Sequence, residues 1–169
     1  AQAQLLRTPA AIAQSAPPDR AGAAAILAGA LAEGREILSE VEAKGVLSAY
    51  NIATVDTRVA ATPDDAAAIA AEMTASDGER LFAVKILSRD ISHKSDVGGV
   101  SLNLDGAEDV REAARSMLER VASALPQARI EGVVVQPMVR RPGAHELLLG
   151  ISDDATFGPV MLFGAGREK

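Results

Sequence analysis

The spacing of apolar residues divides the chain into segments of helical and of strand periodicity. Apolar side chains recur at three- and four-residue steps in some segments, which is typical of amphipathic helices, and they alternate or run continuously in others, which is typical of strands. The predicted helices cover residues 20–32, 35–50, 62–73 and 105–125, and the predicted strands cover residues 52–60, 81–87, 100–104, 130–136, 146–152 and 159–163. This order predicts an α/β or α+β protein in which helices pack on a mainly antiparallel sheet.

Several boundaries carry signals of their own. Gly34 follows the first helix, and Asn51 suits a left-handed position after the second. The motif 62–65, Thr-Pro-Asp-Asp, offers a capping hydroxyl, a proline for the first turn and two carboxylates near the positive end of the helix dipole. Residues 74–80 are predicted to form a turn. The second helix carries an apolar stripe that we expect to face a sheet, formed by Ile37, Val41, Ala43, Leu47 and Tyr50.

Composition and charge exclude several classes of protein. A chain of 169 residues with 48% hydrophobic content is long enough for one globular domain with a sizeable core. The net charge of -6 and the aromatic content of 2% disfavour nucleic acid as a partner, because its binding needs positive charge and stacking surfaces. The sequence has no cysteine for disulfides or thiolate metal sites. No stretch reaches the roughly 20 apolar residues of a membrane span, so we expect a soluble, cytoplasmic protein without a membrane partner.

The two ends of the chain differ from its middle. Residues 1–19 are rich in Ala, Gln and Pro and lack an apolar period, so we assign residues 1–34 to a linker and lead-in helix and residues 35–169 to the folded domain. The chain begins with Ala rather than Met and ends abruptly at Lys169, from which we expect a piece of a longer protein.

A polar loop at residues 88–99, between two predicted strands, concentrates the candidate chemistry. It begins at Ser88 and reads Ser-Arg-Asp-Ile-Ser-His-Lys-Ser-Asp-Val-Gly-Gly, with His93 and Lys94 near its middle. Glycine backbone can approach a phosphate closely and bind it through N–H groups. The loop matches neither the Walker pattern nor a dinucleotide-binding glycine motif. On spacing alone, a single histidine in a polar loop such as His93 is more often an ordinary surface residue than a functional one. The other histidine, His145, is remote, so the spacing predicts no metal site.

Lys85 interrupts the apolar strand before this loop. A half-buried ammonium group needs an anion. That anion is either a protein carboxylate or a nucleotide phosphate, and snorkelling from the strand end is a third interpretation. Farther along, the stretch Gln136-Pro137-Met138 and the carboxylate of Glu146 could hold an adenine and a ribose. An ordinary hairpin with an exposed glutamate explains the same residues equally well.

Five segments in order resemble the ATP-grasp domain of the NDP-forming acyl-CoA synthetases, the group that includes ADP-forming acetate–CoA ligases and the β subunits of succinyl-CoA synthetase. The resemblance covers about residues 35–166, and its most specific piece is His-Lys-Ser-Asp-Val-Gly-Gly-Val at residues 93–100. The other pieces are residues 38–44, 83–88, 132–138 and 157–164. This resemblance implies an α+β ATP-grasp fold whose second lobe is truncated here.

The resemblance also implies roles for individual residues. Lys85 would contact nucleotide phosphates, and Gly98 and Gly99 would belong to a lid loop over them together with Ser88 and Lys94. Gln136, Pro137 and Met138 would form the adenine hinge, and Glu146 would be a ribose or active-site carboxylate. His93 would be the catalytic phosphate acceptor, because a neutral imidazole nitrogen is nucleophilic.

The implied reaction is acid + CoA + ATP giving acyl-CoA + ADP + phosphate through a phosphohistidine relay. It requires ATP or ADP, and a CoA-binding synthetase domain in the same chain or as a separate subunit. It also requires Mg²⁺, whose ligands are expected beyond Lys169, so the resemblance implies no metal ligand within this chain and a catalytically incomplete fragment. Two alternatives stay open: a ligand-sensing and catalytically silent module of a fused protein acetyltransferase, and an α/β scaffold fragment whose ATP site is unused. The acyl substrate and the choice between ADP and GDP are not encoded in these motifs.

Overall fold

The computed structural model describes residues 16–166 except residues 79, 92 and 140. Within it, Ala1–Met138 and Val139–Lys169 form two compact units, each treated by itself below. The linker predicted at residues 1–19 falls largely outside the described residues. No helix in the described part of the chain is both long enough and apolar enough to cross a membrane.

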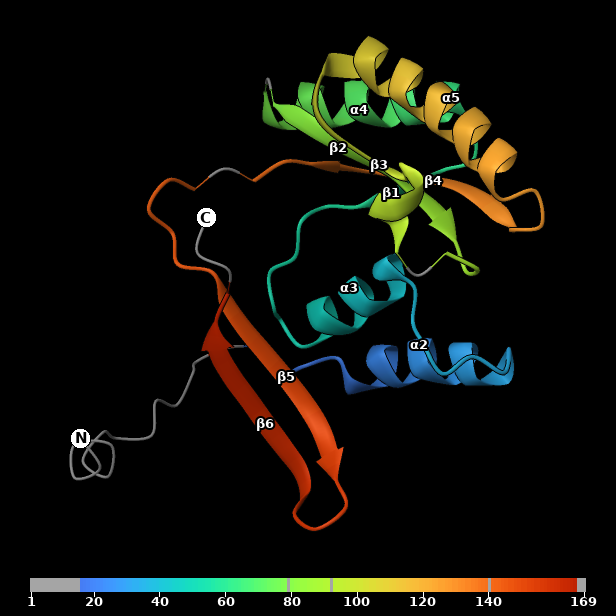
Figure 1. Cartoon of the computed structure of the whole chain (residues 1–169). Helices are drawn as coiled ribbons and strands as arrows, with labels where there is room; N and C mark the ends of the chain where they lie inside the picture. The colour runs from blue at the N-terminus through green and yellow to red at the C-terminus, as the bar shows by residue number, and fades with distance from the viewer. Residues whose placement is uncertain (1–15, 79, 92, 140, 167–169) are drawn as a thin grey trace. The chain divides into compact units, whose positions relative to one another are not determined.

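The first unit is built on a four-stranded antiparallel sheet (Figure 1). Its strands are β1 (Arg58–Ala60), β2 (Leu81–Ser88), β3 (Val100–Asp105) and β4 (Ile130–Pro137), and their order across the sheet is β1-β4-β2-β3. The last of these four strands in the sequence, β4, therefore lies inside the sheet between β1 and β2. The predicted antiparallel sheet and α+β class are confirmed.

Two helices, α4 (Pro63–Asp77) and α5 (Gly106–Ala124), cover one face of this sheet (Figure 1). The core between helices and sheet is fully apolar, as the helical periodicity of residues 105–125 predicts. Its largest fully buried members are Phe82, Val84 and Ile86 of β2, Val133 and Val135 of β4, and Val110, Met117 and Val121 of α5. With no tryptophan in the sequence, this core is filled mainly by aliphatic side chains.

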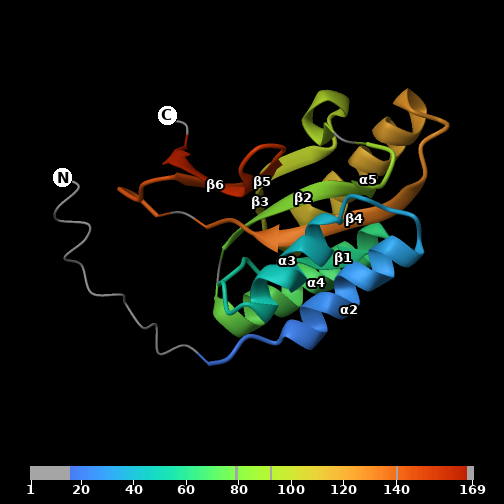
Figure 2. The ribbon, with the colours of Figure 1, turned by 90° about the horizontal axis from the view of Figure 1, so that it is seen from below.

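Helices α2 (Arg20–Ala32) and α3 (Glu40–Ala49) pack against each other and lie on the opposite face of the sheet (Figure 2). The expectation that the apolar stripe of α3 faces the sheet is wrong. Leu47 and Tyr50 are exposed, and polar side chains of α3 contact the sheet instead. The side of α3 that faces the sheet therefore carries charged groups, where the apolar pattern predicts hydrophobic side chains.

Local capping explains where the helices begin and end. Thr62 caps α4, as predicted, and it also forms a capping box with Asp65. Gly34 and Asn51 have positive φ angles of 72° and 60° after their helices. The second helix was predicted from residue 35 but begins at Glu40. Ser39, whose own backbone is extended, acts as its N-cap.

Two other boundaries differ from the prediction. Only residues 58–60 of the predicted strand 52–60 are paired, because β4 offers partners to these three residues alone. Helix α4 continues to Asp77, so the predicted turn 74–80 begins later; Gly78 ends the helix with a φ angle of 83°. Helix α2 has its predicted bounds, and the remaining elements differ from theirs by one or two residues at an end.

The second unit is a hairpin of β5 (Leu147–Asp154) and β6 (Gly158–Ala165), joined in continuous antiparallel register. The carboxylate of Asp154 accepts the amide hydrogens of Thr156 and Phe157 (2.8 and 2.9 Å) and so closes the turn. Apolar side chains are exposed along both strands; the most exposed are Ile151, Met161 and Phe163.

Candidate functional site

Lys85 lies in the middle of β2, on the face of the sheet opposite to α4 and α5. Side chains alternate between the two faces of a strand, so Val84 and Ile86 enter the apolar core while Lys85 projects away from it. On the neighbouring strand β4, Gln136 projects to the same face. The sheet thus places an ammonium group and an amide side by side under α3.

The ammonium of Lys85 forms an ion pair with Glu40, whose Oε1 lies 2.8 Å from Nζ. A second ammonium, that of Lys44, lies 3.1 Å from the same carboxylate oxygen. Both lysines also donate to Oε1 of Gln136, at 2.9 Å from Lys44 and 3.4 Å from Lys85. Lys44 donates in addition to the hydroxyl of Thr57 at 2.6 Å. The result is a cluster of two cations and one carboxylate, called here the Lys44–Glu40–Lys85 cluster.

The capping structure of α3 positions this cluster. Glu42 accepts the amide hydrogen of Ser39 (2.7 Å) and a bidentate pair of hydrogen bonds from Arg35 (2.8 and 2.6 Å). These hydrogen bonds hold the pKa of Glu42 at about 2. Glu40 and Lys44 follow on one helix face because residues four apart are neighbours on a helix surface. The register of the helix start therefore fixes which side chains reach β2.

The environment of Glu40 favours its ionised form. Partial burial would by itself raise the pKa of this carboxyl, but hydrogen bonds from Lys85 and Lys44 outweigh it and hold the pKa below the usual value. All three side chains of the cluster are 22–23% exposed. With two positive charges and one negative charge, the cluster carries a net charge of about +1 and suits a further anion.

The loop between β2 and β3 is attached to the sheet at its beginning. Ser88 is buried and its hydroxyl accepts the amide hydrogen of Asp90 (3.2 Å). The carboxylate of Asp90 accepts the amide hydrogen of Arg129 (2.7 Å), which lowers the pKa of Asp90. Ile91 is 7% exposed and belongs to the core. The described start of the loop thus has a buried apolar anchor, Ile91.

The second half of the loop forms a tight glycine turn. A short 3-10 helix, Lys94–Val97, follows the exposed His93 and ends at Gly98, whose φ angle is 65°. The amide of Gly99 donates to the carbonyl of Lys94 (2.7 Å). A Cβ atom on Gly99 would lie 2.6 Å from Cγ2 of Ile86, so this position requires glycine. The turn is held directly beside β2.

The predicted hinge segment ends β4. Pro137 is buried, and the amide of Met138 donates to the carbonyl of Leu81 (2.7 Å). Of the predicted site residues in the first unit, the structure brings the side chains of Lys85 and Gln136 together and places Gly99 beside the strand that carries Lys85. Glu146 lies in the second unit, directly before β5, where its carbonyl accepts the amide hydrogen of Gly166 (2.8 Å).

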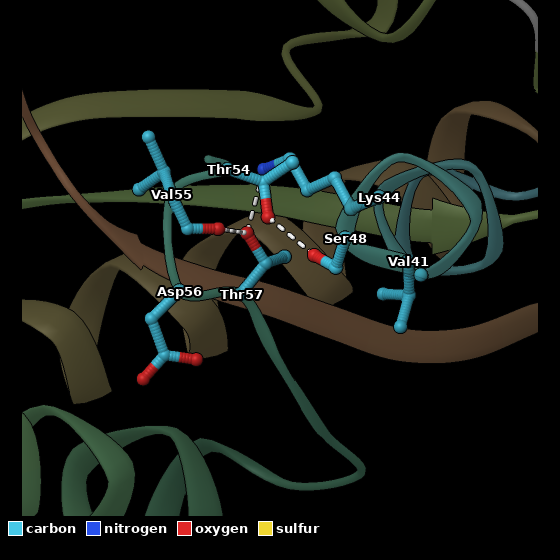
Figure 3. A pocket seen from close by; sticks show the side chains of 8 residues that line it. Val41, Lys44, Ser48, Thr54, Val55, Asp56 and Thr57 are labelled. Carbon is cyan, nitrogen blue, oxygen red and sulfur yellow. Dashed lines mark hydrogen bonds between the residues drawn. The ribbon is translucent and has the colours of Figure 1, made fainter. Parts of the chain in front are cut away.

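A small hollow of about 200 Å³ adjoins the cluster, between α3 and the segment that leads into β1 (Figure 3). The figure shows Lys44 reaching from α3 to the hydroxyl of Thr57, which itself donates to the carbonyl of Val55 (2.9 Å). Ser48 and Thr54 join the two walls of the hollow through their hydroxyls at 3.1 Å. Lys44 is therefore held from three sides, by Glu40, Gln136 and Thr57.

Three residues of this site, Glu40, Lys44 and Thr57, were not predicted from the sequence. Glu40 and Lys44 fall within a segment that carries the family resemblance, and their spacing of four residues was the available signal. For Lys85, the interpretation as an ammonium paired with a protein carboxylate describes the structure itself. Its contact with a phosphate stays a prediction, as do the predicted roles of the other site residues.

The described residues contain no ready-made cluster of metal ligands. Within residues 16–166, apart from the three gaps, no group of three or more His, Cys, Asp or Glu side chains is arranged to hold an ion.

The chain is similar to known proteins in both sequence and fold. The sequence profile of the ATP-grasp domain matches residues 29–168. The ADP-forming acetate–CoA ligase I of Archaeoglobus fulgidus is 41% identical over 121 residues, which is 72% of this chain and 16% of that protein. The β subunit of the ADP-forming acetate–CoA ligase II of Pyrococcus furiosus is 35% identical over 136 residues, 80% of this chain and 55% of the subunit.

A solved structure is similar as well. It is the dinucleotide forming acetyl-coenzyme A synthetase 1 of Ca. Korarchaeum cryptofilum, in complex with coenzyme A, Ca-AMPCP and HgCl⁺. The match has a TM-score of 0.73 and 38% sequence identity, and it covers 85% of this chain and 59% of that one. The chain thus spans less than two thirds of the length of each of these relatives. The family profile, which covers most of the sequence, and the matching fold show that this chain belongs to the ATP-grasp domain family.

Proposed function

We propose that this chain is the nucleotide-binding part of an ADP-forming acyl-CoA synthetase, which interconverts acid, CoA and ATP with acyl-CoA, ADP and phosphate. The observation that carries this proposal is the cation pair beside the glycine turn. Lys44 and Lys85 share one carboxylate, so one positive charge is left to an anion, and Gly99 lies next to the same strand. The similarity to ADP-forming acetate–CoA ligases supports ATP or ADP as that anion.

The nucleotide would lie against the face of the sheet that carries Lys85. The ammonium of Lys85 would bind a phosphate oxygen, and the loop that begins at Ser88 would lie over the phosphates. Lys94 and the backbone amides of Gly98 and Gly99 would supply further donors. The segment Gln136-Pro137-Met138 would contact the adenine, and Glu146 would accept hydrogen bonds from the ribose hydroxyls.

His93 would carry the phosphoryl group. The N–P bond of a phosphohistidine on the CoA-binding domain breaks while a nitrogen of the His93 imidazole forms a new N–P bond. That second N–P bond then breaks as a terminal oxygen of ADP forms the P–O bond of ATP, and the nitrogen regains its lone pair. The exposed position of His93 at the start of the 3-10 helix leaves it accessible to a partner domain.

The partner in this scheme is the CoA-binding synthetase domain, in the same polypeptide or as a separate subunit, in the cytoplasm. Mg²⁺ would neutralise phosphate charge, with ligands outside this chain. The same sequence resemblance would also fit a ligand-sensing module of a protein acetyltransferase. The relatives described above are ligases and synthetases, so they do not support that alternative.

Nucleotide binding tests the first part of the proposal. The sequence has four lysines, at positions 44, 85, 94 and 169, so selective isotope labelling of lysine gives a spectrum simple enough to assign by substitution. Titration with ATP and MgCl₂ should shift the Lys85 signal saturably, and Lys85→Met should weaken binding at least about tenfold, as loss of a charged hydrogen bond requires. Arg115→Met removes the same charge from α5, on the other face of the sheet, and should leave binding unchanged. An unshifted Lys85 signal at saturating ATP would contradict the proposal.

The relay is tested separately in an assembly of this chain with the CoA-binding domain. ATP formation from acetyl-CoA, ADP and phosphate should fall by at least about a thousandfold in His93→Ala, since a nucleophile is lost. ATP binding should be unchanged in the same variant. Normal turnover by His93→Ala would remove this residue from the relay and leave the nucleotide site standing.

A further inference from the structure

The Lys44–Glu40–Lys85 cluster contains one more cation than a single ion pair needs. Glu40 is bound by both ammonium groups, at 2.8 and 3.1 Å, although one would neutralise it. Lys44 is the better-held of the two, because Thr57 and Gln136 also accept its hydrogens at 2.6 and 2.9 Å. Lys85 has a weaker second contact, 3.4 Å to Gln136. The structure therefore contains one firmly placed lysine and one whose main partner is Glu40.

A phosphate that approaches Lys85 must compete with Glu40. If Lys85 turned to the phosphate and Glu40 had no other partner, a partly buried carboxylate would face a second anion, which is unfavourable. With Lys44 in place, Glu40 keeps a cation at 3.1 Å and remains neutralised. The second lysine removes the cost that would otherwise oppose release of Lys85.

We propose that Glu40 and Lys44 are positioning residues for Lys85: Glu40 holds the Lys85 ammonium in the free protein, and Lys44 retains Glu40 when Lys85 transfers to a nucleotide phosphate. This inference rests on the proposed function, because it requires a phosphate at Lys85. No covalent bond changes in the exchange; Lys85 gives up its contact with Glu40 and gains one with the phosphate, while the contact between Lys44 and Glu40 persists.

The proposal and a simple addition of charges predict different ATP affinities for the variants. If charges merely added, Glu40→Gln would strengthen ATP binding by about the factor that Lys44→Met weakens it. If Lys44 compensates Glu40, Glu40→Gln should have little effect while Lys44 is present and a large one when it is absent. A double-mutant cycle separates the two cases, since non-additivity reports coupling between residues in contact.

The experiment measures the Kd of ATP with MgCl₂ for four proteins: the wild type, Lys44→Met, Glu40→Gln and the double variant. We expect Lys44→Met to weaken binding about tenfold, the size of one charged hydrogen bond, and Glu40→Gln to change it less than about twofold. The double variant should return to within about twofold of the wild type. Recovery by a second substitution also excludes misfolding of Lys44→Met as the cause of its weak binding.

Two results would overturn the inference without affecting the proposed function: unchanged binding by Lys44→Met, or additive effects in the cycle while Lys85→Met still abolishes binding. A wild type whose Lys85 signal does not respond to ATP would instead contradict the proposed function, and the inference with it. Arg115→Met serves again as the matched control, because its charge lies on α5, away from the cluster.

Discussion

Arg120 of α5 donates a hydrogen bond from Nη2 to the carbonyl oxygen of Gly98, over 2.7 Å. The contact joins the glycine turn to a helix whose apolar face is buried in the core. Together with the hydrogen bond from the Ile86 amide to the carbonyl of Gly99, it attaches the glycine turn to both α5 and β2. The same contact gives a direct way to loosen the loop without touching its sequence.

Replacing Arg120 with Ala should increase the amide hydrogen exchange of Gly98 and Gly99 several-fold, since one hydrogen bond contributes about 0.5–1.5 kcal/mol. Hydrogen exchange followed by NMR measures this. Arg115→Ala is the matched control, because Arg115 pairs with Glu112 on its own helix. Equal exchange in the two variants would show that Arg120 does not hold the turn.

Gly132 of β4 should not tolerate a side chain. Its φ angle is 127°, and a Cβ atom would lie 2.2 Å from the carbonyl oxygen of Ala60. Gly132→Ala should therefore cost at least ~2 kcal/mol in the free energy of unfolding. Gly29→Ala, in α2 where a Cβ meets nothing within 4 Å, should instead stabilise by roughly 0.5–1 kcal/mol. Urea unfolding of both variants measures the difference, and similar midpoints would refute it.

The ion pair at the start of α3 should make stability depend on pH at the acid end. The pKa of Glu42 is about 2 in the folded chain against 4.5 for an ordinary glutamate. Because the folded pKa is depressed, its contribution is fully present above about pH 4.5 and is lost as pH falls towards 2. Glu42→Gln should therefore lose less stability than the wild type between pH 5 and pH 2.

Urea midpoints at several pH values across that window test this dependence. Glu119→Gln is a suitable control, since Glu119 is an exposed residue on α5. It should follow the wild-type pH profile. Identical profiles for Glu42→Gln and the wild type would contradict the assigned pKa.

The packing of α5 on the sheet should depend on Met117, which is completely buried in the core. Met117→Ala should reduce the free energy of unfolding by about 2–5 kcal/mol, the usual cost of a large-to-small core substitution. Leu31→Ala removes a comparable side chain that is 68% exposed on α2 and should change stability by less than about 0.5 kcal/mol. Chemical unfolding gives both values, and a loss below about 1 kcal/mol for Met117→Ala would be incompatible with this core.

The sequence predicts the elements that local chemistry determines. The motif at residues 62–65 caps α4 as expected. The apolar run of β2 is fully buried on the face that carries Phe82, Val84 and Ile86, while the other face is only partly buried.

The predicted start of α3 was wrong because a capping box between Ser39 and Glu42 begins the helix at Glu40. Arg35 lies before this start, and its side chain pairs with Glu42 instead of continuing the helix. The predicted length of β1 was wrong because its pairing partners on β4 lie more than 70 residues away in the sequence.

The candidate site was predictable only in part, for a similar reason. A lysine inside an apolar strand needs an anion, so Lys85 stands out in the sequence. Glu40 and Lys44 read as ordinary surface residues of an amphipathic helix, and the apolar pattern of that helix predicts the wrong face towards the sheet. Their spacing of four residues places them on one face of α3, but the contacts of that face with Lys85 of β2 and Gln136 of β4 are long-range and cannot be read from the spacing.

The central position of β4 has a consequence for synthesis of the protein. Strands β1, β2 and β3 emerge first from a ribosome, but β1 and β2 have no contact in the sheet until β4 inserts between them. A nascent chain that ends before residue 130 therefore exposes one whole edge of β2, with its apolar side chains, to other chains. Completion of Pro137 is the moment at which this sheet can close, so a pause in translation just before β4 would extend the period in which a chaperone is needed.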